Sequence, residues 1–221
     1  MRRSGGPSVL VVLGLFFIGI GGGVAYMVNR GMTAEVERAT RLSAVSATRL
    51  DDLPAGSEVL VEGLIAPSNR ADERGMVASV TERYKGKDND GHDEWRVSAR
   101  ATPPLLLTAG GGAIQIANTG YDLRARPHMI EPKGGLYYNG ITGDASERYS
   151  GFKAGDVVVA VGRTAPGREG MAVEAEFLSG GTRAQLIDSG RTGARIAVIL
   201  GAVFVVIGLA MAAFGLIRLV R

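Results

Sequence analysis

The chain has 221 residues, of which 46% are hydrophobic and 21% charged, and it contains 33 Gly and no Cys. The absence of Cys excludes disulfides, thiol nucleophiles, iron–sulfur clusters and Cys-based zinc sites, and only two His remain for a metal site. All 22 acidic residues lie within residues 31–190, where they outnumber 18 Lys and Arg. The net charge of +3 therefore does not indicate nucleic-acid binding. We expect no cofactor, no metal and no nucleic-acid partner.

The first membrane candidate lies near the N-terminus. Residues 4–29 carry no charge, and an apolar run at 8–28 within them predicts a transmembrane helix, which needs about 20 apolar residues. A cleaved signal peptide is the alternative, because Arg2 and Arg3 precede the run. The run is longer than the roughly 7–15 apolar residues of a signal peptide, and no clear cleavage site follows it. We therefore favour an uncleaved anchor.

A second uncharged stretch, residues 196–217, predicts another transmembrane helix over 195–217. Positive charge before the first helix favours cytoplasmic termini, although the Arg residues around the second helix give no such bias. The long middle segment can be translocated largely regardless of its charge. We predict a two-pass protein of the cell membrane, with cytoplasmic termini, an extracytoplasmic middle domain and the lipid bilayer as its first partner.

Glycine recurs at seven-residue spacing in both predicted membrane helices. The repeated residues are Gly14 and Gly21 in the first helix and Gly201, Gly208 and Gly215 in the second. Gly19 and Gly23 add a G-x-x-x-G pattern. Small residues on one face let helix backbones approach closely within lipid. We interpret the stripe as a packing surface between the two helices or between subunits, and the general abundance of Gly leaves a compositional origin open.

The sequence between the membrane helices changes character near Pro54. Apolar and small residues at helical spacing predict a juxtamembrane helix or linker over 29–52. Residues 53–182 contain short alternating runs separated by Gly-rich turns, a polar hairpin loop at 82–94 and an irregular insertion at 122–153. Such runs without a long helix predict a mainly β domain, a small antiparallel OB-like β-barrel flanked by the two transmembrane helices.

Three segments of this domain occur in a familiar order. They are LPAGSEVLVEG at 53–63, LLLTAGGGAIQIANTG at 105–120 and FKAGDVVVAVGRT at 152–164. With the flanking helices, they resemble the GIDE-type or "beside a membrane" domain of the mitochondrial E3 ubiquitin ligase family and its prokaryotic relatives. In that family a zinc-binding RING domain made of Cys and His performs ubiquitin transfer. This chain has no Cys, so the resemblance implies the architecture and an interaction domain but not the ligase activity.

Motifs for catalysis and ligand binding are weak. Ser150 and Lys153 fit S-x-x-K, but the partner motifs of that chemistry are missing. The acidic residues of 88–94 do not follow the EF-hand spacing, and residues 110–112 are not followed by the Lys of a P-loop. We expect His92 and His128 to be solvated or hydrogen-bonded, and we predict no catalytic site.

Aromatic residues gather in the predicted insertion and could contact a partner. They are Tyr137, Tyr138, Tyr149 and Phe152; packing of these rings onto the barrel is the alternative. We predict a non-catalytic scaffold that binds a protein partner or forms a homo-oligomer at the membrane surface. A membrane enzyme or enzyme accessory, and a small-molecule or lipid binder, are the alternative functions.

Overall fold

The structure is a computed structural model of the chain, and it describes residues 6–132, 146–168 and 170–220. The chain divides into two compact units. One unit combines Met1–Arg41 with Ile187–Arg221 and is helical, and the other, Leu42–Leu186, contains the described strands. The helical unit therefore joins the two ends of the chain, whereas the β unit is one continuous segment.

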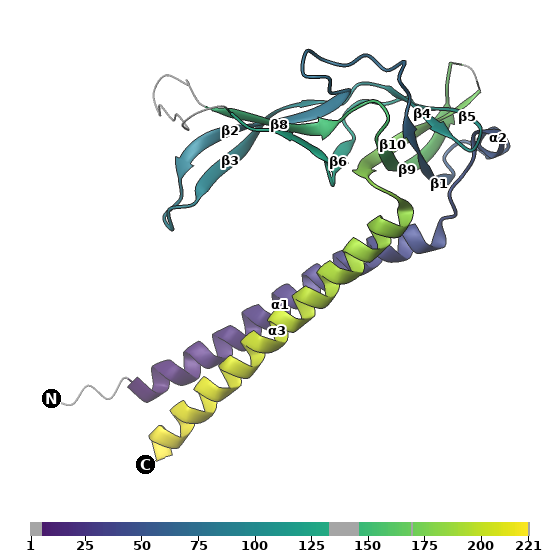
Figure 1. Cartoon of the computed structure of the whole chain (residues 1–221). Helices are drawn as coiled ribbons and strands as arrows, with labels where there is room; N and C mark the ends of the chain where they lie inside the picture. Colours follow the sequence, from purple (N-terminus) through teal and green to yellow (C-terminus); the bar gives the residue numbers. More distant parts are fainter. Residues whose placement is uncertain (1–5, 133–145, 169, 221) are drawn as a thin grey trace. The chain divides into compact units, whose positions relative to one another are not determined.

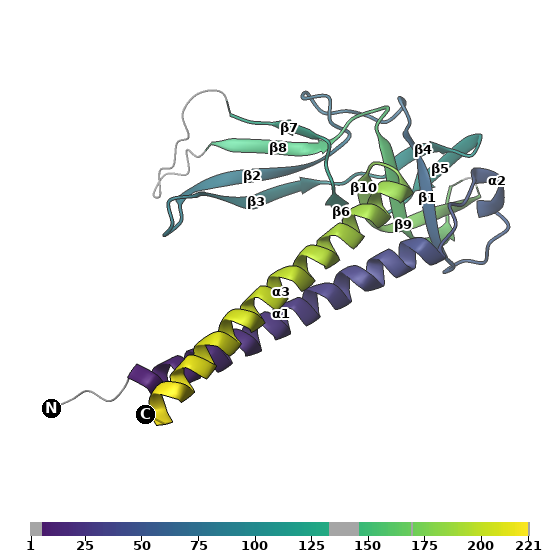
Figure 2. The same ribbon diagram turned by 60° about the horizontal axis from the view of Figure 1, so that its bottom comes forward.

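Two long helices make up the helical unit. They are α1 (Gly6–Arg41) and α3 (Arg183–Val220), which lie side by side in both views of the ribbon (Figures 1 and 2). Among the described residues, one helix, Arg183–Arg218, is long and apolar enough to cross a membrane, and α1 contains a shorter apolar segment, Ser8–Gly23. The C-terminal helix is thus compatible with membrane association, and a second crossing by α1 stays a prediction.

The segment predicted as a juxtamembrane helix or linker over 29–52 is not one continuous helix in the structure. α1 ends at Arg41, and a short helix, α2 (Ala47–Leu50), follows after a break. Within the break Ala44 forms an isolated bridge to Leu60 of the first strand. Leu50, the last residue of α2, is 2% exposed and belongs to the hydrophobic core. Pairing with a strand and burial in the core therefore outweigh the local helical pattern.

The β unit contains a closed five-stranded barrel, which confirms the predicted mainly β domain. Its strands are β1 (Glu58–Ile65), β4 (Leu105–Ala109), β5 (Gly112–Ile116), β9 (Val157–Pro166) and β10 (Met171–Gly180). They follow the order β5-β4-β1-β9-β10, and a parallel pairing of Ile116 with Val173 joins β5 to β10 and closes the barrel. A short strand, β6 (Asp122–Arg124), runs parallel to β10.

A second sheet, which the sequence did not predict, has four strands in the order β3-β2-β8-β7. They are β2 (Ala78–Lys87), β3 (Asp93–Ala101), β7 (His128–Ile130) and β8 (Glu147–Phe152). β2 and β3 come from the segment between β1 and β4, and β7 and β8 from the segment between β5 and β9 (Figure 2). Because β2 and β3 extend into the polar loop predicted over 82–94, only residues 88–92 separate them.

One hydrophobic core joins the barrel and the second sheet. Phe152 of β8 and Val80 of β2 lie in the same cluster of buried residues as Val61 of β1. Tyr121 is buried in this cluster, and its hydroxyl donates a hydrogen bond of 2.6 Å to the carbonyl oxygen of Pro103. Burial raises the pKa of Tyr121, which keeps its hydroxyl protonated as a donor. Packing as well as chain connections therefore anchor the second sheet to the barrel.

The first turn of α3 is capped immediately after the last barrel strand. The N–H of Thr182 donates to Oε1 of Gln185 at 2.9 Å, and the N–H of Gln185 donates to Oγ1 of Thr182 at 3.3 Å. This reciprocal pair is a capping box. The N–H of Arg183 also donates to Oε2 of Glu62 in β1 at 3.1 Å. The start of α3 is thereby fixed to the barrel wall.

Candidate interaction surfaces

The glycines predicted to pack the helices lie where α1 and α3 meet. All five, Gly14, Gly21, Gly201, Gly208 and Gly215, are buried. A Cβ added at Gly14 would lie 2.5 Å from the carbonyl oxygen of Gly208, and one added at Gly21 would lie 2.5 Å from Cβ of Phe204. Because these neighbours are a backbone atom and a β-carbon, the helices at these points leave no room for a larger residue.

The contact between the helices continues beyond these glycines. Phe17 and Phe204 stack with their ring centroids 5.8 Å apart, and a Cβ at Gly190 would collide with the side chain of Val36. By contrast, an added Cβ at Gly19 or Gly23 would have no neighbour within 4 Å. The residues of the G-x-x-x-G pattern therefore lie away from the contact, and the seven-residue repeat marks it.

The four aromatic residues predicted as a partner surface do not lie together in the described part of the chain. Tyr137 and Tyr138 fall outside the described residues. Phe152 is 0% exposed and belongs to the core, which corrects its assignment to a surface. Tyr149 remains partly exposed on β8 and is the member of this group that the structure places at the surface.

Tyr149 belongs to a polar cluster on one face of the four-stranded sheet. The guanidinium of Arg74 lies 3.8 Å from the centroid of its ring. The Tyr149 hydroxyl donates to Oε2 of Glu147 at 2.7 Å, and Arg83 donates to Oε1 of the same carboxylate at 2.8 Å. These hydrogen bonds from Tyr149 and Arg83 hold the pKa of Glu147 below its usual range. The cluster is thus charged at neutral pH, ordered by its own contacts and accessible.

The opposite face of the sheet carries a second cluster, because successive residues of β8 point to opposite sides. Arg148 donates to Oε2 of Glu82 at 2.9 Å, and its guanidinium lies 4.5 Å from the ring centroid of Trp95. The rings of Trp95 and Tyr84 are 5.5 Å apart, and the Tyr84 hydroxyl donates to Asp93 at 3.3 Å. Both faces therefore combine an Arg–Glu pair with an aromatic ring.

Neither cluster was predicted from the sequence. Arg83 and Glu147 are 64 residues apart, and Glu82 and Arg148 are 66 residues apart. They meet because β2 and β8 pair antiparallel, with each of these residues opposite its partner. The sequence feature that could have indicated the clusters is the run of charged and aromatic residues at 147–149, which is typical of a strand with two solvated faces.

The S-x-x-K motif does not form a catalytic pair. Ser150 is 1% exposed, and its hydroxyl oxygen has no hydrogen-bond partner among the described residues, so Lys153 does not activate it. His128 is hydrogen-bonded at 2.9 Å to Oδ1 of Asp156, whose Oδ2 accepts the N–H of Lys153 at 2.7 Å. His128 lies opposite Gly151, and thus on the other face of the sheet from Ser150. The His–Asp pair orders the turn before β9.

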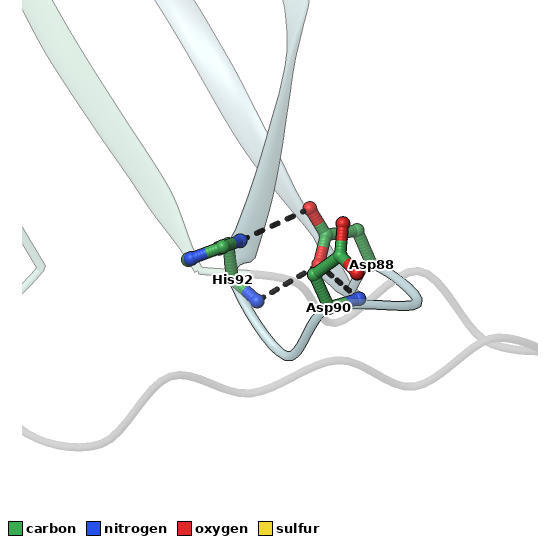
Figure 3. Close-up of side chains that lie close together, drawn as sticks. All are labelled: Asp88, Asp90 and His92. Carbon is green, nitrogen blue, oxygen red and sulfur yellow. Dashed lines mark hydrogen bonds and ion pairs between the residues drawn. The ribbon is translucent and has the colours of Figure 1, made fainter. Parts of the chain in front are cut away.

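Three potential metal ligands lie at the exposed tip of the β2–β3 hairpin (Figure 3). Ligand atoms of Asp88, Asp90 and His92 lie within 4.8 Å of one another. Oδ1 of Asp88 accepts the N–H groups of Asp90 at 2.9 Å and of His92 at 2.8 Å. The carboxylate therefore orders the turn itself, as expected for a solvated hairpin tip.

A hollow of about 440 Å³ lies beside the loop that follows β1, bordered by Asp72, Glu73 and Met76. Oδ1 of Asp72 accepts the N–H groups of Arg74 at 2.9 Å and of Met76 at 2.8 Å, and Glu73 lies 3.2 Å from Arg74. Both carboxylates at the rim are therefore engaged within the loop. This arrangement orders the loop and does not resemble a paired acid–base site.

Comparison with known proteins finds no matching family model, no matching curated protein and no matching solved structure. The resemblance to the GIDE-type domain therefore stays a prediction from the sequence. Two features of the molecule bear on its function, which are the glycine-lined contact of α1 with α3 and the ordered polar clusters on the four-stranded sheet.

Proposed function

We propose that this is a two-pass membrane protein in which α1 and α3 anchor a non-catalytic β domain that binds another protein. The observation that carries the proposal is the arrangement of residue sizes on the helices. Glycines line the contact, whereas large apolar side chains such as Phe16 (60% exposed) and Val206 (64% exposed) point away from it. The exposed large apolar residues of the two helices lie within 9–26 and 196–217. A soluble protein does not expose apolar surface over so many turns of a helix pair, and lipid would cover it.

The register of the helices supports a second crossing by α1. Gly14 faces Gly208, and an added Cβ at Gly21 would lie 3.3 Å from the carbonyl oxygen of Gly201, so the helices run antiparallel. The uncharged part of α1 therefore lies beside the uncharged residues 196–217 of α3. A helix packed along a membrane-spanning helix over this length would share its depth in the bilayer.

For the β domain we propose an OB-like module related to the GIDE-type domain. The OB-fold is a five-stranded Greek-key barrel that binds ligands on one face and with its loops. The strand order of this barrel, closed by a parallel pair between its third and fifth strands, supports that assignment. The absence of Cys means that the proposal includes no ubiquitin transfer.

The four-stranded sheet is the proposed binding surface. Arg, Tyr and Trp are the residue types that contribute most to protein–protein binding energy, and the two clusters present them as Arg74, Tyr149, Trp95 and Arg148. Their mutual contacts hold the side chains in place before binding. Binding of a partner would therefore cost these side chains little conformational entropy.

The membrane part of the proposal is tested by labelling single cysteines, because the chain has none of its own. Asn89 lies at the exposed tip of the β2–β3 hairpin. We expect Asn89→Cys to react with an impermeant maleimide in whole cells. Ser4→Cys, before the first apolar run, should react only after the membrane is permeabilised. Labelling of Asn89→Cys only after lysis, or of both positions from outside, contradicts the proposed topology.

The binding surface is tested by crosslinking in native membranes. A photoreactive phenylalanine derivative in place of Tyr149 should crosslink to a discrete protein, because this ring lies in the proposed surface. The matched position is Arg163, which is exposed on the barrel wall between Glu58 and Glu174 of the neighbouring strands. The same probe there should give no such product. Identical products from both positions, or none from Tyr149, would argue against the sheet as the binding surface.

A further inference from the structure

β3 is an edge strand of the four-stranded sheet. It has nine residues, and among the described residues only β2 pairs with it. Its second half, residues 97–101, is exposed throughout. Such an edge presents a row of backbone N–H and C=O groups to which another strand can be added.

The first half of β3 has a self-complementary order of side chains, Glu94-Trp95-Arg96. Glu94 and Arg96 point to the same face, because Nε of Arg96 donates to Oε1 of Glu94 at 2.7 Å. Their side chains are 38% and 69% exposed, so both remain accessible to a second chain. Trp95 points to the other face, where Tyr84 and Arg148 hold its ring. Along β3 a negative charge therefore precedes Trp95 and a positive charge follows it, both on the face opposite its ring.

This order selects one way of pairing two copies of β3. If the strands run antiparallel with Trp95 opposite Trp95, each Glu94 lies opposite Arg96 of the other copy on the same face. Opposite charges in directly opposed positions stabilise antiparallel strands, and like charges destabilise them. A register centred on Arg96 would instead place two Arg96 side chains opposite each other.

The rest of β3 limits the pairing to residues 93–97. A β-bulge at Ser98 shifts the register, because Ala99 pairs with Thr81 whereas Val97 pairs with Glu82. Beyond the bulge, Arg100 is bonded to Asp122 at 3.0 Å and so is already paired. A second irregularity lies opposite Glu94, where β2 carries the extra residue between Tyr84 and Lys87, so the bulged strand there is β2 and not β3. Charges and bulges on an edge usually prevent uncontrolled pairing, and here they leave one favourable register.

We propose that two copies of this chain associate through antiparallel pairing of β3 centred on Trp95, so that the four-stranded sheet continues from one copy into the other. The partner is thus a second copy of the chain, recognised by the alternation of acid, aromatic ring and base. The proposal goes beyond the binding of another protein and does not depend on it.

The pairing is tested by oxidative crosslinking of the full-length protein in native membranes. At the two-fold position, opposed Cα atoms would lie about 4.5–5.5 Å apart, within the range that a disulfide spans. Trp95→Cys should therefore form a disulfide-linked dimer. Val97→Cys is the matched control, because its two copies would lie four residues apart, about 13 Å. Absence of the dimer for Trp95→Cys, or an equal yield for Val97→Cys, overturns the proposal.

A charge exchange tests the same register without replacing Trp95. Glu94→Arg and Arg96→Glu each place like charges opposite one another and should abolish the dimer, measured as molecular mass by light scattering in detergent. The double variant restores opposite charges in exchanged positions and should regain the dimer. Single variants with the mass of the unmodified dimer, or a double variant that stays monomeric, contradict the pairing.

Discussion

Two buried hydroxyl groups in the β unit have opposite environments. Oγ1 of Thr164, a residue 2% exposed, donates to the carbonyl oxygen of Pro54 at 2.6 Å and accepts the N–H of Ser57 at 2.9 Å. Ser150 is 1% exposed and lies opposite the buried Val80, and its hydroxyl has no partner among the described residues. A buried hydroxyl without a partner lowers the stability of the fold, so its removal does no harm. A buried hydroxyl that forms hydrogen bonds contributes to stability, so its removal is costly.

Ser150→Ala should therefore leave the free energy of unfolding unchanged or raise it by up to about 1 kcal/mol, because it removes a hydroxyl that gains nothing from the fold. Thr164→Val keeps the shape of the side chain but removes the bonds of its hydroxyl to the Pro54 carbonyl and the Ser57 N–H, which keep only the bonds between Pro54 and Ser57. It should lower the free energy of unfolding by about 1 kcal/mol, the usual net contribution of a hydrogen bond. The measurement is thermal and denaturant unfolding of the detergent-solubilised protein. A loss for Ser150→Ala equal to that for Thr164→Val would show that Ser150 has a bonding partner.

At the scale of single residues, the sequence indicates chemical type but not surroundings. The spacing of Ser150 and Lys153 matches a nucleophile motif, yet the period of two in β8 directs Ser150 toward the core. Phe152, two residues further on, is buried for the same reason. The sequence did not place these strand residues relative to the core, because that depends on which face of β8 meets the barrel.

At the scale of elements, the contact between α1 and α3 depends on the absence of side chains. A Cβ at Gly208 would lie 2.5 Å from the carbonyl oxygen of Gly14 and 2.8 Å from Cγ1 of Ile18. The oxygen cannot move without displacing the backbone of α1. Val206, two residues earlier on α3, is 64% exposed and points away from this contact.

Gly208→Leu should therefore separate the two helices and lower the stability of the helix pair by about 1–3 kcal/mol, the usual cost of overpacking. Val206→Leu places the same side chain on the outer face, where it adds one methylene, and should be tolerated. Both variants are compared by thermal unfolding in detergent. Equal unfolding temperatures for the two variants would mean that the glycine repeat reflects composition and that the helices serve as independent anchors.

Elements with a clear local pattern were predicted, and a segment that pairs with a distant strand was not. The apolar stretches and the glycine repeat are local patterns with helical spacing, and most strand runs alternate clearly. Within the segment predicted as a helix or linker, residues 42–46 are not helical, and Ala44 there bridges to Leu60 of β1. That segment has a helical pattern in isolation, and its partner strand begins well after it in the chain.

At the scale of the whole molecule, the long connections of the β unit determine its architecture. Short loops would suffice to connect the five barrel strands. The connections after β1 and after β5 are instead long, and each contributes two strands to the second sheet. Pairing of β2 with β8 joins these two insertions. The surface proposed to bind a partner and the edge proposed to bind a second copy therefore both belong to the insertions and lie outside the barrel.

The sequence by itself determined the uncharged apolar stretches, the glycine repeat, the mainly β character of residues 53–182 and the absence of Cys-dependent chemistry, because each depends on composition or on spacing within one segment. The tertiary structure decided the closure of the barrel through Ile116 and Val173, the second sheet and both Arg–Glu clusters. These features join residues far apart in the chain, and their register is set when a shared core forms around Phe152 and Tyr121. No local pattern specifies which strand becomes the neighbour of another.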